Sequence, residues 1–266
     1  MSTSTSEAPT RNGHHVDVDG IRTYYEVTGT GDPVLLLHGG LAPAETFDPQ
    51  VPALAERYAV YVPERVGHGR TPDVDGQFTY EAMAQHTISF MEALGIGRAD
   101  LVGWSDGALI GLLVALRRPA MVRKLVLIDQ FVTLAGAPPE YHAFMATLSP
   151  EKTPPGLAEL YGMVSPDGAD HFPVVFEKLH QMWTRPTGIE VADLARVAAP
   201  TLVLNGDDGG MTLAHADEVR RTLPDSQLAV VPGTSHGLGM EKPHVVNQLL
   251  LDFLADEQAP KLFALE

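Results

Sequence analysis

Residues 99–113 read ADLVGWSDGALIGLL, a stretch that places a serine between two apolar segments. The first segment, residues 99–104, is a short apolar run typical of a buried strand, and the segment that follows the serine is long and helix-like. The residues GWSDG (103–107) join the two and leave no room for an ordinary loop. Glycine suits such a crowded turn because it has no Cβ. We therefore expect Ser105 on a sharp strand-to-helix turn with its hydroxyl exposed.

Short apolar runs alternate with helical patterns along the rest of the chain. Nearly continuous apolar runs suit strands that are buried on both faces of a mostly parallel sheet. Alternating strands and helices predict an α/β layered fold. The strand-like runs are HHVDV (14–18), IRTYYEV (21–27), PVLLLHG (33–39), YAVYVP (58–63), ADLVGW (99–104), VRKLVLI (122–128), PTLVLNG (200–206) and SQLAVVPG (226–233). The helical patterns cover residues 80–94, 106–118, 213–223 and 244–254.

One region, residues 131–186, breaks this alternation. It has no strand-like run but is rich in proline, aromatic residues and methionine. Because it follows the carboxyl end of a strand, where ligands bind in α/β sheets, we predict a helical cap over a pocket. The core then consists of residues 14–130 and 187–258. A polar tail at 1–13 is expected to be disordered, and residues 259–266 look vector-derived.

Composition and charge narrow the classes of function. The chain has 266 residues, with 18 Lys and Arg against 34 Asp and Glu, which gives a net charge of −16. This acidity disfavours nucleic acid and anionic membranes as partners and leaves a small-molecule substrate. The absence of cysteine excludes disulfides, thiolate nucleophiles and Cys-ligated metals. No signal peptide or membrane-spanning run is evident, so we expect a cytoplasmic protein; an oligomer is compatible with the sequence.

A serine hydroxyl becomes a good nucleophile only when a base takes its proton. Among the 11 histidines, His236 lies in VVPGTSHGLG, between the last strand and the last helix, at the carboxyl edge of the sheet. An oxyanion hole also needs two preorganised backbone N–H groups. We expect one from Asp106, directly after the serine, and the other from the loop that follows VLLLHGG, where residues 39–40 are both glycine.

Taken together, these segments resemble the α/β-hydrolase superfamily over nearly all of residues 20–256. The resemblance implies an α/β-hydrolase fold, a mostly parallel sheet flanked by helices, with a helical cap after the sixth strand. It also implies Ser105 as nucleophile, His236 as base, Gly40 and Asp106 as oxyanion donors, and no metal or organic cofactor. The segments that carry it are LLLHGG, PERVGHGRTPD, GWSDGA, LVLID, PTLVLNGDD and PGTSHG.

The sequence departs from the family pattern at the acid of the triad. Family members commonly carry it after the seventh strand, but NGDDGGM places Gly209 at the matching position. Asp207 and Asp208 lie one or two positions early on that loop. Asp129 ends the sixth strand, 24 residues after Ser105, and this spacing resembles zearalenone-type lactonases and some haloalkane dehalogenases. We predict Asp129 as the acid, with Asp208 and Asp207 as alternatives.

The leading hypothesis is a serine hydrolase that cleaves an ester or lactone of a small, largely apolar substrate through an acyl-enzyme. The apolar preference is inferred from the predicted cap, in which Trp183 is the best candidate for substrate contact. Two alternatives remain: a non-hydrolytic cyclase, lyase or cofactor-free oxygenase of secondary metabolism on the same fold, and a small-molecule receptor. The cap residues behind the inference are Phe144, Met145, Met163, Phe172, Phe176, Met182 and Trp183.

Overall fold

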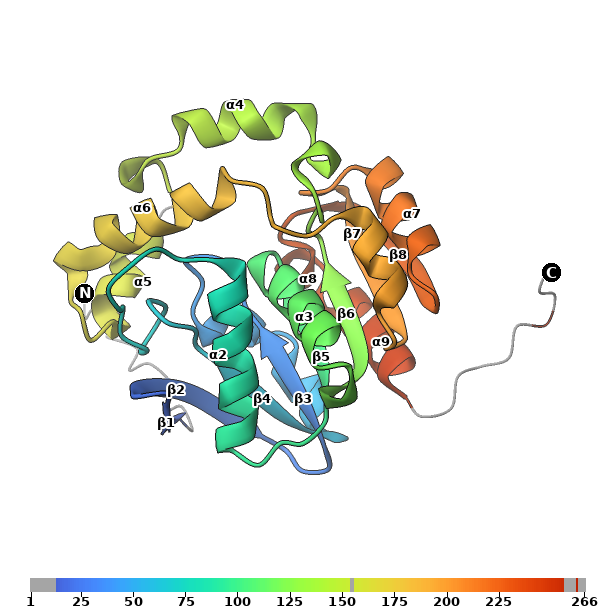
Figure 1. Cartoon of the computed structure of the whole chain (residues 1–266), viewed down its shortest axis with the longest axis horizontal. Coiled ribbons are helices and arrows are strands. Elements are labelled where there is room, and N and C mark those ends of the chain that lie inside the picture. Colours follow the sequence, from blue (N-terminus) through green and yellow to red (C-terminus); the bar gives the residue numbers. More distant parts are fainter. Residues whose placement is uncertain (1–12, 154–155, 256–261, 263–266) are drawn as a thin grey trace, which may run out of the picture.

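The centre of the computed structural model is an eight-stranded sheet (Figure 1), and the residues described are 13–153, 156–255 and 262. The strand order is β1-β2-β4-β3-β5-β6-β7-β8. β2 pairs antiparallel with both β1 and β4, and all other pairs are parallel. The strands are β1 (Gly13–Val18), β2 (Ile21–Thr28), β3 (Asp32–Leu37), β4 (Tyr58–Pro63), β5 (Ala99–Trp104), β6 (Val122–Ile128), β7 (Thr201–Asp208) and β8 (Ser226–Ser235).

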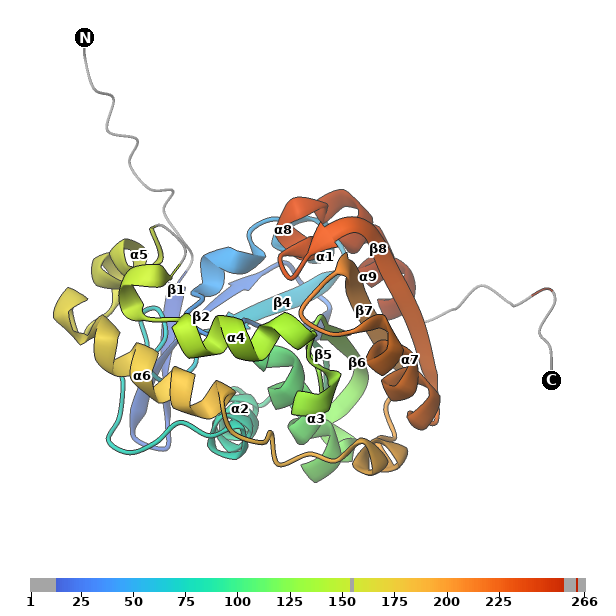
Figure 2. The ribbon, with the colours of Figure 1, turned by 90° about the horizontal axis from the view of Figure 1, so that it is seen from above.

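Helices cover both faces of this sheet (Figure 2), as the predicted fold class requires. One face packs against α1 (Val51–Ala55), α8 (Leu238–Glu241) and α9 (Pro243–Leu254). The other packs against α2 (Tyr80–Ala93), α3 (Asp106–Arg117) and α7 (Leu213–Thr222). Short 3-10 helices are η1 (Ala44–Phe47), η2 (Pro119–Met121), η3 (Leu134–Gly136), η4 (Pro150–Lys152), η5 (Ala169–His171) and η6 (Val191–Arg196). Each predicted strand coincides with an observed one, and the two sets of ends differ by at most two residues.

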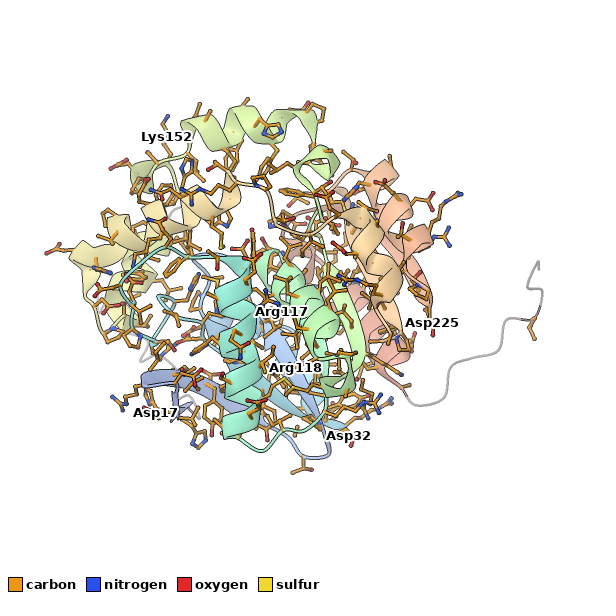
Figure 3. The ribbon with its side chains drawn as sticks, viewed as in Figure 1. Asp17, Asp32, Arg117, Arg118, Lys152 and Asp225 are labelled. Carbon is orange, nitrogen blue, oxygen red and sulfur yellow. The ribbon has the colours of Figure 1, made fainter. Side chains whose placement is uncertain are left out.

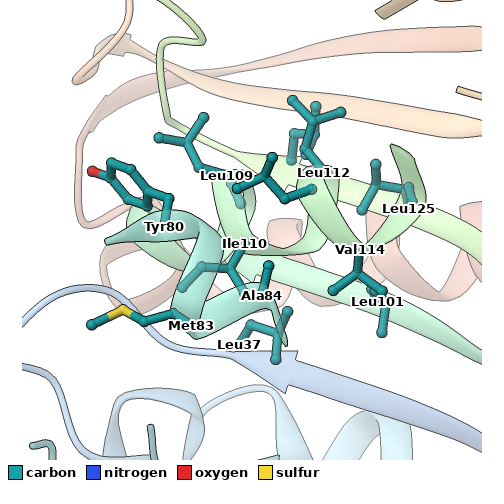
Figure 4. Packing of buried hydrophobic residues seen from close by; sticks show 14 of the residues in the cluster. Leu37, Tyr80, Met83, Ala84, Leu101, Leu109, Ile110, Leu112, Val114 and Leu125 are labelled. Carbon is teal, nitrogen blue, oxygen red and sulfur yellow. The ribbon is translucent and has the colours of Figure 1, made fainter. Parts of the chain in front are cut away.

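Helix α3 occupies the centre of the core because it is apolar on nearly every side. Its residues from Asp106 to Ala115 are all buried, between α2 and the central strands. Figure 4 shows Leu109, Ile110 and Val114 of this helix in the same apolar cluster as Leu101 of β5. The first turn of α3 lies directly against β3, since a Cβ on Gly107 would come within 1.9 Å of the Leu37 carbonyl oxygen. This close approach holds the residue before the helix, Ser105, at the carboxyl edge of the sheet.

The segment 131–186 is helical and contains no strand among its described residues. It forms α4 (Pro139–Thr147), α5 (Leu157–Val164) and α6 (Phe172–Trp183), which lie beyond the carboxyl ends of the central strands (Figure 1). Lys178 of α6 forms an ion pair with Asp73, with Nζ 2.6 Å from Oδ2. His171, just before α6, lies within hydrogen-bond distance of the same oxygen, at 2.9 Å. We call this segment the cap; its gating role and the domain limits remain predictions.

Charged residues lie on the outer surface, and the two chain ends lie largely outside the described residues. The six charged residues labelled in Figure 3 are all exposed, among them Asp17, Arg118 and Asp225. β1 begins at Gly13, the last residue of the predicted tail, and the rest of that tail, 1–12, lies outside the described residues. Most of the segment 259–266 also lies outside them. No helix in the described chain combines the length and the apolar run needed to cross a bilayer.

Candidate active site

Ser105 lies at a strained turn between β5 and α3. Its φ of 55° and ψ of −126° fall in a region that side-chain-bearing residues rarely adopt. The turn needs glycine on both sides: a Cβ on Gly103 would come within 2.2 Å of the Gly107 carbonyl oxygen. The backbone N–H of Ser105 donates to the carbonyl of Ile128 at 3.0 Å. Strain of this kind is concentrated at functional sites.

The structure brings Ser105, His236 and Asp129 together in one hydrogen-bonded chain. His236 Nε2 lies 3.0 Å from Ser105 Oγ, and His236 Nδ1 lies 2.7 Å from Asp129 Oδ2. The Asp129 carboxylate is fully buried and also accepts backbone N–H groups from Gly206 at 3.3 Å and Gly210 at 2.6 Å. These donors fix the position of the carboxylate, which suits it to orient the imidazole.

The departure at Gly209 has a physical reason. A Cβ on Gly209 would come within 2.0 Å of Asp129 Oδ1, so the carboxylate of Asp129 occupies the space that a side chain there would need. The two alternative aspartates lie elsewhere. Asp207 accepts the backbone N–H of Thr234 at 3.0 Å, and Asp208 is exposed at the end of β7. Neither makes a hydrogen bond to His236 within the described chain.

The two residues expected to form the oxyanion hole, Gly40 and Asp106, lie side by side. A Cβ on Gly40 would come within 2.6 Å of Asp106 Oδ2 and 2.3 Å of the Trp183 ring. The Asp106 carboxyl group accepts hydrogen bonds from Tyr80 Oη at 2.9 Å and from Trp183 Nε1 at 2.8 Å. Burial raises the pKa of Asp106, although the positive charge of Arg65 and these two donors oppose the shift.

Arg65, which the sequence analysis did not assign to the site, contacts the backbone directly after β3. Its side chain is 2% exposed and donates to the carbonyl of His38 and, at 3.0 Å, to that of Gly39. Its backbone N–H donates to His38 Nε2 at 3.1 Å. Burial lowers the pKa of Arg65 to about 10, which leaves it charged at neutral pH. The only sequence signal was its place in the PERVGHG segment.

Trp104 is a second residue that the sequence analysis did not assign to the site. Its indole Nε1 donates to the backbone carbonyl of His236 at 2.7 Å, and the two rings lie 5.2 Å apart between centroids. A Cβ on Gly39 would come within 2.8 Å of the same indole. The residue before the serine therefore supports both the histidine loop and the glycine loop.

A pocket of about 770 Å³ lies over Ser105 and His236 and beneath the cap. Three of the seven cap residues considered above line it, Phe144, Met145 and Trp183. The others do not: Met163 is 75% exposed, whereas the remaining three are packed in the core. Trp183 reaches the pocket, but its N–H is engaged by Asp106, so any substrate contact must use the ring. The remaining lining residues include Leu41, Phe131, Tyr141, Leu148, Leu157, Leu160 and Met240.

The arrangement has the parts that acyl transfer needs: a hydroxyl, an imidazole in contact with it, and a carboxylate on the other ring nitrogen. The pocket supplies a largely apolar space in front of the hydroxyl. Within the described residues, no group of three His, Cys, Asp or Glu side chains is placed to hold a metal ion.

Comparisons with known proteins give a consistent result. The chain is 31% identical over 253 residues to serine hydrolase BPHL of Homo sapiens, covering 90% of this chain and 85% of that protein. It is 29% identical over 271 residues to 2-hydroxy-6-oxo-2,4-heptadienoate hydrolase of Pseudomonas putida, covering 92% and 97%. The solved structure of Est816, described as an N-acyl homoserine lactone degrading enzyme, matches with a TM-score of 0.74 at 25% identity, covering 91% and 100%.

The sequence profile of the alpha/beta hydrolase family matches residues 34–249, from the third strand to the last helix. That range holds the serine turn, the histidine loop, the Asp129 carboxylate and the whole cap. The relatives named above are hydrolases, and the strand order and the site geometry agree with the match. The chain therefore belongs to the alpha/beta hydrolase family.

Proposed function

We propose that this protein is a serine hydrolase that cleaves an ester or lactone of a small, largely apolar substrate through an acyl-enzyme. One observation carries the proposal: the hydrogen-bonded chain from Asp129 through His236 ends at the hydroxyl of Ser105, which lines a largely apolar pocket. Carbonyl compounds with an oxygen leaving group are the substrates that such a triad attacks most readily.

In the proposed mechanism, Ser105 Oγ attacks the substrate carbonyl carbon while His236 Nε2 takes the hydroxyl proton. The backbone N–H groups of Gly40 and Asp106 stabilise the oxyanion that forms. His236 then returns the proton to the departing alkoxide oxygen, which leaves an acyl-Ser105 ester. A water molecule, deprotonated by His236, hydrolyses this ester. Asp129 holds the imidazole tautomer and stabilises its protonated form throughout.

The names of the relatives support hydrolysis but span several bond types, so the bond cleaved is part of the proposal. The likeness to an N-acyl homoserine lactone degrading enzyme favours a lactone or ester. The non-hydrolytic alternative was compatible with an altered acid position at Gly209. Because Asp129 hydrogen-bonds to His236, the departure at Gly209 no longer favours that alternative.

The test compares purified wild type with Ser105→Ala and His236→Ala on p-nitrophenyl hexanoate. We expect each substitution to lower kcat on the order of a thousandfold or more, because either one removes the activated nucleophile. Ser149→Ala, in the cap, serves as the matched control and should retain activity. Mass spectrometry of quenched wild-type reactions should show the acyl adduct on the peptide that contains Ser105. Near-wild-type turnover by Ser105→Ala would end the proposal, provided that its melting temperature is unchanged.

A further inference from the structure

The pocket over Ser105 has a distinctive charge pattern. Its charged lining residues, beside the imidazole of His236, are the acids Glu45, Asp106 and Asp208. No lysine or arginine lines it among the described residues. The two cap residues outside the description, 154–155, are prolines and carry no charge. Apart from His236, the described lining is therefore apolar, neutral and polar, or acidic.

Two arginines near the site are engaged by other groups, and neither lines the pocket. Arg65 is buried behind the glycine loop and donates to two backbone carbonyls. Arg70 contacts Glu45 at 2.5 Å and Glu64 at 2.7 Å, so one guanidinium is shared by two carboxyl groups. Since neither guanidinium lines the pocket, neither is placed to neutralise an anionic group on a bound ligand.

A carboxylate on a substrate would meet an unfavourable environment here. It would lose its hydration in a largely apolar cavity without gaining an ion-pair partner, and such burial is costly. It would also approach the carboxylates of Glu45 and Asp208 within a protein of net charge −16, which adds repulsion. A neutral acyl chain incurs neither cost and gains from the burial of its apolar surface.

We propose that the pocket accepts uncharged acyl groups and rejects acyl groups that carry a carboxylate. The inference takes its reaction from the proposed function, but the selectivity comes from the lining of the pocket alone. A cavity of about 770 Å³ is in the range that encloses ligands of drug size, so it can hold chains well beyond acetyl. The substrate class is then a neutral ester or lactone with an extended apolar acyl part.

The experiment uses two esters that differ in one group, p-nitrophenyl hexanoate and the mono-p-nitrophenyl ester of adipic acid, which ends in a carboxylate. We expect wild type to favour the neutral ester by about 100-fold in kcat/KM at pH 7.5, which corresponds to about 2.7 kcal/mol. Comparable kcat/KM values for the two esters, or a preference for the adipate ester, would overturn the inference.

Variants at the mouth of the pocket test whether its charge is the cause. Phe144 lines the pocket and is 55% exposed, so a charged replacement can remain hydrated there. Phe144→Lys should reduce the preference for the neutral ester at least tenfold relative to the uncharged replacement Phe144→Gln. Asp208→Asn should reduce the ratio several-fold. Equal ratios in Phe144→Lys and Phe144→Gln would contradict the inference.

A binding measurement separates this inference from the proposed reaction. The Ser105→Ala variant is heated with methyl hexanoate or with monomethyl adipate at equal millimolar concentration, and its melting temperature is recorded. We expect stabilisation by the neutral ester only. If wild type hydrolyses neither ester but this difference persists, the proposed function fails and the selectivity stands. Equal stabilisation by the two esters would overturn the selectivity, whatever the turnover.

Discussion

Two residues of the hydrogen-bonded chain have unusual backbone angles and lie at the ends of neighbouring strands. Ser105 and Asp129 end β5 and β6, and both have positive φ, 55° and 51°. Each such conformation costs on the order of 1–3 kcal/mol and persists only where the surroundings enforce it. Here the enforcing contacts are the β3–α3 packing beneath Ser105 and the backbone donors to Asp129. In these backbone conformations both side chains contact the imidazole of His236.

The acid assignment is tested by Asp129→Asn. We expect kcat to fall on the order of 10³–10⁴-fold because an amide cannot hold the imidazole tautomer or stabilise its protonated form. Asp207→Asn, on the neighbouring loop, is the control and should have little effect on kcat. A large loss in Asp208→Asn combined with near-normal activity in Asp129→Asn would assign the acid to the β7 loop instead.

The glycine at the proposed oxyanion hole can be tested by Gly40→Ala. The added Cβ has no space, because it would press on the Trp183 ring and the Asp106 carboxyl group. We expect kcat to fall about 100-fold, the effect of displacing one oxyanion donor. Gly97→Ala is a matched control for a general glycine effect, since its Cβ meets nothing within 4 Å and its φ is not positive. An unchanged kcat in Gly40→Ala would remove Gly40 from the oxyanion hole.

At the scale of elements, one side chain joins the cap to the catalytic end of the core. Trp183 ends α6, and its indole both donates to Asp106 and packs on Gly40. Tyr80, at the start of α2, donates to the other oxygen of the same carboxyl group. The position of the cap is thus coupled to both residues whose N–H groups we assign to the oxyanion hole.

The coupling predicts the behaviour of Trp183→Phe. The ring is largely kept, but the Asp106 carboxyl group loses a donor, which costs about 1–3 kcal/mol of stability. We expect kcat to fall about tenfold with KM changed less than threefold, measured on p-nitrophenyl hexanoate. Tyr80→Phe removes the other donor without touching the cap and should lower stability similarly. A change confined to KM would make Trp183 a substrate contact only.

At the scale of the whole molecule, buried histidines make the free energy of unfolding fall at acid pH. Burial lowers the pKa of His68 to about 3 and that of His86 to about 4, and it holds the pKa of His38 well below the ordinary value. In the unfolded chain these groups bind protons near pH 6.5. Stability is therefore complete above about pH 6.5 and is lost as the pH falls toward the folded-state values.

The size of this effect can be predicted. At pH 5 each buried histidine lowers the free energy of unfolding by about 2 kcal/mol. This pH lies about 1.5 units below the pKa of histidine in the unfolded chain, and one unit corresponds to 1.36 kcal/mol. Glu64 acts in the opposite direction: burial raises its pKa to about 7, so the folded state binds its proton first and offsets about one histidine. Urea unfolding should show a net loss of about 4 kcal/mol in the free energy of unfolding between pH 7.5 and pH 5.

A matched variant isolates the contribution of one histidine. His86→Gln can keep a hydrogen bond to the Thr23 hydroxyl, which His86 Nε2 contacts at 3.0 Å, but it cannot titrate. The variant should lose about 2 kcal/mol less than wild type over the same pH range. A pH dependence identical to that of wild type would show that His86 is not a source of the acid sensitivity.

The sequence by itself determined the α/β sheet, its flanking helices and the positions of Ser105 and His236. These are local properties: apolar runs and helical periodicity record which faces are buried, and GWSDG records a turn that only glycine permits. The helical segment 131–186 could be predicted because it contains no strand-like run. Its inward-facing residues could not, because composition does not tell which side of a helix meets the pocket.

The sequence favoured Asp129 among the three aspartates, but only the tertiary structure shows that it contacts His236 and reveals the contacts around Asp106. Asp129 and His236 are 107 residues apart, and their meeting depends on the register of β6, β7 and β8. Gly209 looked like a departure in the sequence, but in space it makes room for the Asp129 carboxylate. Such pairings arise where distant strands end at one edge of a sheet, and no local pattern encodes them.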